Sequence, residues 1–227
     1  MSIMYFFLIL ILLSIIPAFW INYVFRKNDE ILPNMPFDGS EFGEKLIKEL
    51  GLKGVCLEKT SIGDHYDPDQ RKIKVLENRL NRKSLTSISV ICHEIGHAIQ
   101  HAQNYAPLMT RTKLVKNTLW INKISAATIY FGLPAILATG FVPLIKFCIL
   151  IVLLSLFIGV IIHLVTLEVE LDASFNKAFP IIKKKVPKIY HDSCRSILRA
   201  AAFTYVVGVF KNLLSLRMIW SVLSRIR

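Results

Sequence analysis

Long apolar stretches with almost no charge place the strongest constraint on what this chain can fold into. A helix that spans a bilayer needs roughly 20 predominantly apolar residues, and residues 3–24 provide such a stretch without one charged side chain. Arg26 and Lys27 follow it directly, whereas a cleaved signal peptide carries its basic residues in front. We therefore expect a retained transmembrane anchor at residues 3–24.

A second apolar region covers residues 119–167, and the sequence Gly-Phe-Val-Pro at 140–143 interrupts it. Two spans joined by a tight turn, a transmembrane hairpin, account for this pattern. Residues 200–222 are also apolar but contain Lys211 and Arg217, so that both a fourth transmembrane helix and an interfacial helix fit them. The predicted fold class is mainly α, a polytopic membrane protein with three or four transmembrane helices.

Two polar segments separate the apolar stretches. The larger is residues 25–118, and its positions 25–117 contain 15 Lys/Arg and 12 Asp/Glu. The smaller, residues 168–199, contains 7 Lys/Arg and 4 Asp/Glu. Because basic loops tend to stay in the cytoplasm, both segments are predicted to be cytoplasmic. We attribute the net charge of +12 to contact with a lipid bilayer and not to nucleic-acid binding, since the chain shows no nucleic-acid-binding motif.

The larger polar segment is predicted to form a small α+β domain. Asp38 and Glu41 have the spacing of a capping box, which predicts a helix that ends at Gly51. Short strands are expected at 55–59 and 72–76, on either side of a polar loop, and the latter could act as an edge strand that pairs with an extended peptide. From about Ser84 to Gln103 the sequence predicts one continuous helix, with Ser84 as its N-cap.

The residues best suited to catalysis lie on that helix, in the sequence HEIGH at positions 93–97. His93 and His97 are four residues apart, so both imidazoles share one helical face and can bind one Zn²⁺. Glu94 lies beside them, where it can take a proton from a metal-bound water and later pass it to a leaving amine. This pattern predicts a zinc-dependent peptidase.

A catalytic zinc ion normally has three protein ligands, so one more is required. His101 shares the helical face, but it lies one further turn, about 6 Å, along the axis, and we expect it beside the ligands or at the helix end. The other candidates are acids that follow the hairpin: Glu168, Glu170 and Asp172. Two membrane crossings return these acids to the side that holds HEIGH. The helical geometry does not choose among them, and acids that only mark the end of a span are also possible.

Four separated motifs occur in order along the chain: DHYDP at 64–68, HEIGHAIQH at 93–101, YAPL at 105–108 and VTLEVELDAS at 165–174. Together they resemble the YugP-like family of membrane-bound neutral zinc metallopeptidases. The resemblance implies a gluzincin-like endopeptidase with Zn²⁺ as its cofactor and Glu170 as the third ligand. Glu168 departs from the family pattern, which often has proline there.

The DHYDP motif leaves two interpretations open: His65 and Tyr66 could approach the oxyanion of a substrate, or the motif could be a structural turn. Asp172, like His101, is a candidate for contact with the substrate or the ligands. The predicted function is hydrolysis of peptides or membrane proteins at the cytoplasmic face of the cell membrane. The alternatives are an intramembrane protease of the site-2 type and a non-catalytic zinc-binding membrane scaffold, which would not need Glu94.

Overall fold

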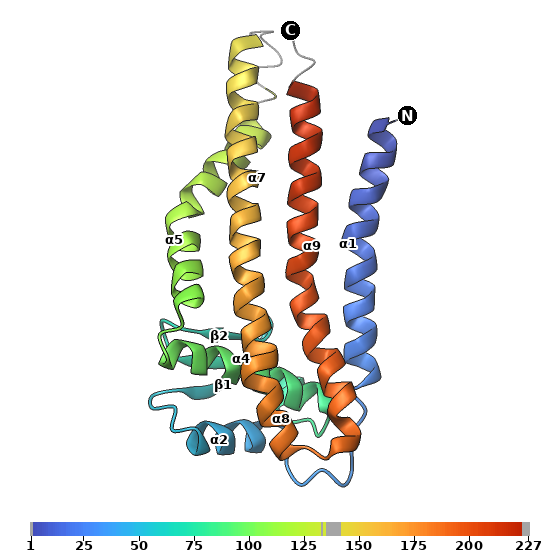
Figure 1. Cartoon of the computed structure of the whole chain (residues 1–227), viewed down its shortest axis with the longest axis vertical. Coiled ribbons are helices and arrows are strands. Elements are labelled where there is room, and N and C mark those ends of the chain that lie inside the picture. The colour runs from blue at the N-terminus through green and yellow to red at the C-terminus, as the bar shows by residue number, and fades with distance from the viewer. Residues whose placement is uncertain (1, 133, 135–141, 224–227) are drawn as a thin grey trace. The chain divides into compact units, whose positions relative to one another are not determined.

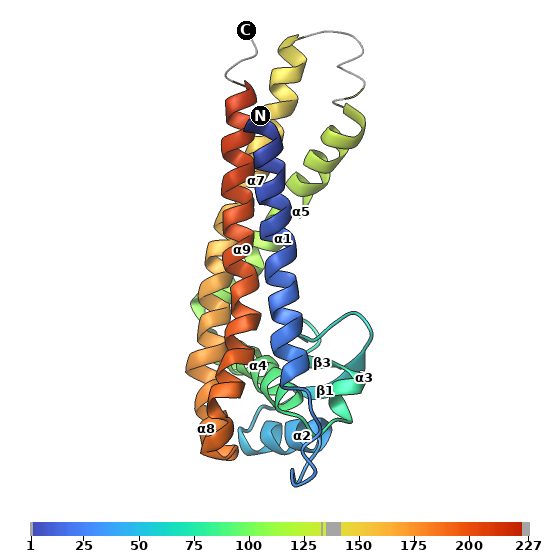
Figure 2. The same ribbon diagram turned by 90° about the vertical axis from the view of Figure 1, so that its right-hand side faces the viewer.

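The computed structural model describes residues 2–132, 134 and 142–223, and it is mainly helical with one small sheet (Figures 1 and 2). The elements in chain order are α1 (Ser2–Lys27), α2 (Gly39–Glu49), β1 (Cys56–Thr60), β2 (His65–Asp67), β3 (Lys72–Leu76), α3 (Glu77–Leu80), α4 (Leu85–Ala102), α5 (Ala106–Ala127), the π-helix η1 (Thr128–Gly132), α7 (Val142–Leu171), the π-helix η2 (Asp172–Ala178), α8 (Phe179–Lys185), the 3₁₀-helix η3 (Lys188–Tyr190) and α9 (His191–Leu223). The chain divides into two compact units. The first comprises Met1–Ile16, Thr110–Thr166 and Tyr205–Arg227, and the second comprises Pro17–Met109 and Leu167–Thr204.

The sheet belongs to the second unit and has the strand order β1-β3-β2, with β1 parallel and β2 antiparallel to β3. The strands expected at 55–59 and 72–76 are confirmed as β1 and β3. Two expectations were wrong. The polar loop between them contains a third strand, β2, and β3 lies in the centre of the sheet rather than at an edge. Three residues are too few for β2 to show a strand pattern in the sequence.

The two helices that pack on the sheet begin where the sequence predicts. Asp38 accepts a hydrogen bond from the backbone N of Glu41 at 2.9 Å, and the Glu41 carboxylate accepts one from the backbone N of Asp38 at 3.1 Å, which completes a capping box. Ser84 caps α4 by accepting a hydrogen bond from the backbone N of Ser87 at 3.1 Å. Since α4 continues without a break to Ala102, all of HEIGH lies on one regular helix.

Both α2 and α4 cover one face of the sheet, where Ile73 and Val75 of β3 are fully buried. The opposite side of α4 packs against η2, and Gly96 makes that approach possible. A Cβ atom built on Gly96 would lie 2.6 Å from the carbonyl oxygen of Ala173, closer than any side chain tolerates. The glycine within HEIGH therefore lets the segment after α7 lie directly against the HEIGH helix.

The two aspartates of DHYDP hold β2 in place. Asp64 accepts a hydrogen bond from the backbone N of Leu76 at 2.8 Å and forms an ion pair with Arg79. Asp67 forms an ion pair with Lys74 at 2.9 Å and also accepts hydrogen bonds from the turn that follows it. Because Lys74 and Leu76 lie on β3 and Arg79 lies just beyond it, these carboxylates tie the short edge strand to the centre of the sheet.

Among the described residues, two helical stretches are long and apolar enough to cross a membrane: Pro143–Lys185, whose most apolar 18-residue window has a mean hydropathy of 3.1, and Lys188–Arg217, whose window has a mean hydropathy of 1.4. The predicted anchor at 3–24 is helical as part of α1. The turn predicted at 140–143 falls partly outside the described residues. A total of three or four transmembrane helices stays a prediction.

Within the first unit, α7 and α9 lie side by side and approach closely at two glycines (Figures 1 and 2). A Cβ atom on Gly208 of α9 would lie 2.6 Å from the imidazole of His163 on α7. In the same way, a Cβ atom on Gly159 of α7 would lie 2.5 Å from the side-chain amide of Asn212 on α9. Small residues let two helices pack closely, so each helix here accommodates a polar side chain of the other next to a glycine.

Candidate metal centre

His93, His97 and Glu170 converge in the second unit, and each offers a ligand atom within 4.8 Å of the others. Glu170 Oε2 lies 3.0 Å from His93 Nε2 and 3.5 Å from His97 Nε2. Ligands of a tetrahedral zinc ion, with bonds of about 2.0–2.1 Å, stand about 3.3 Å from one another. The observed spacing therefore fits a single ion bound by two nitrogens and one carboxylate oxygen.

The outer nitrogen of each imidazole is occupied by a neighbouring side chain. His93 Nδ1 is 3.1 Å from Ser174 Oγ, and His97 Nδ1 is 3.0 Å from Gln100 Oε1. Both rings are thereby oriented with Nε2 towards Glu170, as metal-binding histidines usually are. These donors are typical of zinc, and the residues present fit that metal.

Neither Gln100 nor Ser174 was predicted as a functional residue. Gln100 could have been found from the sequence, since it follows His97 by three residues on one helix and so shares its face. Ser174 could not, because its contact with His93 depends on how η2 packs against α4.

The structure brings Glu170, and not Glu168, to the imidazoles. Residues two apart on an α-helix point about 200° apart around its axis, so only one of these acids can face α4. Glu170 is 5% exposed. Glu168 is exposed, and its Oε1 accepts a hydrogen bond from the hydroxyl of Tyr105 at 3.5 Å. The assignment of Glu170 as the third zinc ligand stays a prediction, which is supported by the short distances from its carboxylate to the two imidazoles.

Glu94 lies beside the three clustered residues without belonging to them. It follows His93 directly, which places it about 100° further around α4. Its side chain is buried, with the residue 6% exposed, and its negative charge acts on the His97 imidazole. A buried carboxylate at this position is available to exchange protons with a group bound at the centre.

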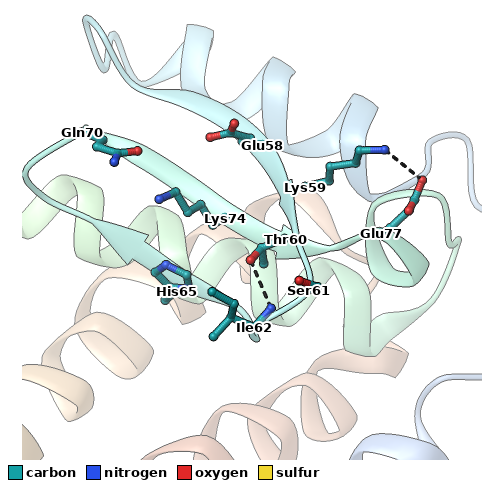
Figure 3. A pocket seen from close by; sticks show the side chains of 9 residues that line it. All are labelled: Glu58, Lys59, Thr60, Ser61, Ile62, His65, Gln70, Lys74 and Glu77. Carbon is teal, nitrogen blue, oxygen red and sulfur yellow. Dashed lines mark hydrogen bonds and ion pairs between the residues drawn. The ribbon is translucent and has the colours of Figure 1, made fainter.

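Of the other predicted site residues, His65 and Tyr66 lie on β2 and point to opposite faces of the sheet, whereas Asp172 lies at the start of η2. Tyr66 of β2 faces α4, and its hydroxyl is 2.8 Å from Nδ1 of His101, which lies outside the metal cluster. His65 is paired with Lys74 in the sheet and points away from α4. It lines a cavity of about 500 Å³ on the outer face of the sheet (Figure 3). Alternation along β2 therefore leaves Tyr66 near the HEIGH helix and turns His65 away from it.

The protonation of His97 is set by the acids around it. Burial alone lowers the pKa of the His97 imidazole, but the hydrogen bond and charge of Glu170, together with the charge of Glu94, outweigh burial and raise that pKa to about 9. Below that pH, the metal-free protein holds His97 as an imidazolium ion. Zinc needs a neutral imidazole, so binding has to release this proton.

We therefore expect the zinc affinity of the full-length protein to increase about tenfold for each pH unit between 7 and 8. With an ordinary histidine pKa near 6.5, His97 would already be neutral in this range and would add no such dependence. Competition with a chelator of known proton affinity measures the effect. An affinity that does not change between pH 7 and 8 would contradict the raised pKa.

This site has the characteristic arrangement of zinc metallopeptidases. It consists of two histidines four apart on a helix, a glutamate from another helix, and a second glutamate next to the first histidine. Comparison with known sequences agrees with this class: the chain belongs to the family described as "putative neutral zinc metallopeptidase", whose sequence profile matches residues 3–224. The chain is also 28% identical over 207 residues to a Bacillus subtilis (strain 168) protein named "Putative membrane protease YugP", with 88% of each chain covered. No solved structure matches the chain.

Proposed function

We propose that this chain is a zinc-dependent endopeptidase held in the membrane, which hydrolyses peptides or membrane proteins at the cytoplasmic face. The observation that carries the proposal is the convergence of His93, His97 and Glu170 beside the buried carboxylate of Glu94. Family membership and the relative named as a membrane protease support peptide hydrolysis. The two long apolar helices support membrane attachment, and the basic residues of segments 25–118 and 168–199 support the cytoplasmic orientation.

The proposed chemistry divides between the metal and Glu94. A zinc ion at this site would polarise the scissile carbonyl and lower the pKa of a bound water. The Glu94 carboxylate accepts a proton from the attacking water and then donates it to the nitrogen of the leaving amine. The side chains of His93, His97 and Glu170 are largely buried, and electrostatic effects are stronger in such a site than in bulk water.

We further propose that an extended substrate binds along the free edge of β2. This strand forms one edge of the sheet as described by the structure, and it packs against α4. Its Tyr66 contacts His101, one helical turn beyond His97. Backbone hydrogen bonds to an edge strand hold peptides in many complexes. The sequence suggested residues 72–76 as the edge strand that pairs with a peptide, and we now propose β2 for this role.

Neither alternative function gains a specific observation in its favour. A site-2-type protease carries its HExxH sequence inside an apolar span, whereas α4 packs against a sheet and is not one of the candidate membrane helices of the described chain. A zinc-binding scaffold would have no need for the buried carboxylate of Glu94 beside the ligands.

Removal of the metal tests the proposal directly. The purified full-length protein in detergent should contain about one zinc per chain and cleave an unstructured substrate such as casein. A strong chelator should abolish cleavage, and added zinc, but not magnesium, should restore it, because His, His and Glu favour zinc over a hard cation. The variant His101→Ala, changed outside the metal cluster, should retain its zinc. Cleavage that persists in fully metal-free protein would contradict the proposed function.

A further inference from the structure

Gln100 connects the two parts of the chain that form the metal centre. It is completely buried on α4, and its side chain has three hydrogen-bonding partners. Its Oε1 is 3.0 Å from His97 Nδ1, while its Nε2 donates to the backbone oxygen of Val169 at 2.8 Å and to Asp172 Oδ2 at 2.9 Å. The last two acceptors flank Glu170 in the sequence, so one amide side chain holds both a histidine from α4 and the segment that carries Glu170.

These contacts determine how the Gln100 amide is oriented. A backbone carbonyl and a carboxylate oxygen can only accept hydrogen bonds, so both must face the NH₂ group of Gln100. The carbonyl oxygen of the amide must therefore face His97. Since that oxygen can only accept, His97 Nδ1 must carry the hydrogen, which leaves Nε2 as the nitrogen with a free lone pair when the ring is neutral.

Asp172 accepts one of the two hydrogen bonds that the Gln100 amide donates. It is 9% exposed and lies at the start of η2. While its Oδ2 accepts from Gln100, its Oδ1 accepts a hydrogen bond from Asn176 Nδ2 at 2.8 Å. Asp172 is not part of the metal cluster, so its effect on His97 passes through Gln100.

We propose that Asp172 and Gln100 form a relay that holds His97 in the tautomer that binds the metal and keeps the Glu170 segment against α4. Both are positioning residues, and neither is a ligand. The relay rests on the metal site of the proposed function but not on its catalysis. Its test therefore measures metal binding and stays valid even if no peptide substrate is cleaved.

The relay is tested by the dissociation constant for zinc, measured in the full-length protein by chelator competition. Gln100→Ala should weaken zinc binding by about 10- to 100-fold, the usual effect of removing a partner that orients a metal-binding histidine. Asp172→Ala should weaken binding less. Because Asp172 acts through Gln100, the double variant should bind zinc no more weakly than Gln100→Ala alone. Independent, additive losses would overturn the relay.

Two further variants separate positioning from general damage. Asp172→Asn retains an acceptor oxygen for Gln100 and should keep most of the affinity that Asp172→Ala loses. The matched control is Gln103→Ala: Gln103 also links the end of α4 to η2, by accepting a hydrogen bond from Lys177 at 2.8 Å, but it is exposed and does not contact a predicted ligand. This control should bind zinc like the unmodified protein.

Gln100→Met keeps the buried volume and removes all three hydrogen bonds, so it replaces Gln100→Ala if that variant does not fold. Cobalt in place of zinc gives a second measurement, since its visible absorption spectrum depends on ligand geometry. We expect the spectrum to change in the Gln100 variants and to stay unchanged in Gln103→Ala. Normal zinc affinity and a normal cobalt spectrum in a folded Gln100 variant would overturn the proposal.

Discussion

Glu94→Gln should retain zinc and lose about 10²- to 10⁴-fold in the rate of peptide hydrolysis, the contribution expected of a positioned general base. Glutamine has nearly the same shape as glutamate, so the packing of this buried position should survive the change. An amide cannot accept the proton of the attacking water, and it cannot return one to the leaving amine. Zinc content by elemental analysis and the cleavage rate of a casein substrate, measured on the same preparation, check both parts of the prediction.

The matched control is Glu77→Gln, in which an exposed glutamate paired with Lys59 at 3.5 Å is changed in the same way. Exposed ion pairs contribute little to stability, and this one joins β1 to the start of α3 (Figure 3). The control should cleave at the normal rate. Normal cleavage by Glu94→Gln would show that Glu94 is not the base, and loss of its zinc would show that Glu94 has a different role at the site.

Glu170→Ala should weaken zinc binding by more than about 100-fold, beyond what removal of an outer partner costs. The change deletes the only carboxylate of the cluster and leaves two imidazoles facing an empty position. Glu168→Ala is the matched control, since it removes an acid two residues earlier that is exposed and hydrogen-bonded to Tyr105. Zinc affinity measured by chelator competition should be normal in this control.

The opposite result has a clear meaning. If Glu168→Ala loses zinc and Glu170→Ala keeps it, the third ligand is Glu168 and not Glu170. If both keep it, the third ligand lies elsewhere. Circular dichroism of the metal-free variants separates loss of a ligand from loss of the fold, because the helical signal can be recorded without zinc.

Several parts of this protein could be predicted from local sequence because they depend only on neighbours along the chain. Asp38 and Glu41 define a helix start by their spacing, and both hydrogen bonds of the capping box are present. Ser84 caps the HEIGH helix, which is regular to its end. The shared face of His93 and His97 follows from helical periodicity alone.

Other parts could not be predicted because they depend on contacts between distant segments. β2 is too short to give a pattern, and it is held by side chains of Asp64 and Asp67 that bond to β3 and beyond. Local sequence carries no information about which side of the helix faces α4, so only the family resemblance favoured Glu170 over Glu168; the structure places Glu170 beside the imidazoles, and its role as a ligand stays a prediction. The contact of Ser174 with His93 has the same origin.

The long apolar stretches that constrained the chain at the outset predicted a mainly helical fold, since only helices or closed barrels satisfy backbone hydrogen bonds in lipid, and the described residues are mainly helical. Sequence by itself also supplied the two histidines and the neighbouring glutamate of HEIGH. Tertiary structure decided the rest of the candidate metal centre: Gly96 lets η2 approach α4, and that approach brings Glu170, Ser174 and the Gln100 amide together. The physical reason is that helical periodicity sets which residues share a face, whereas close packing between helices sets which faces meet.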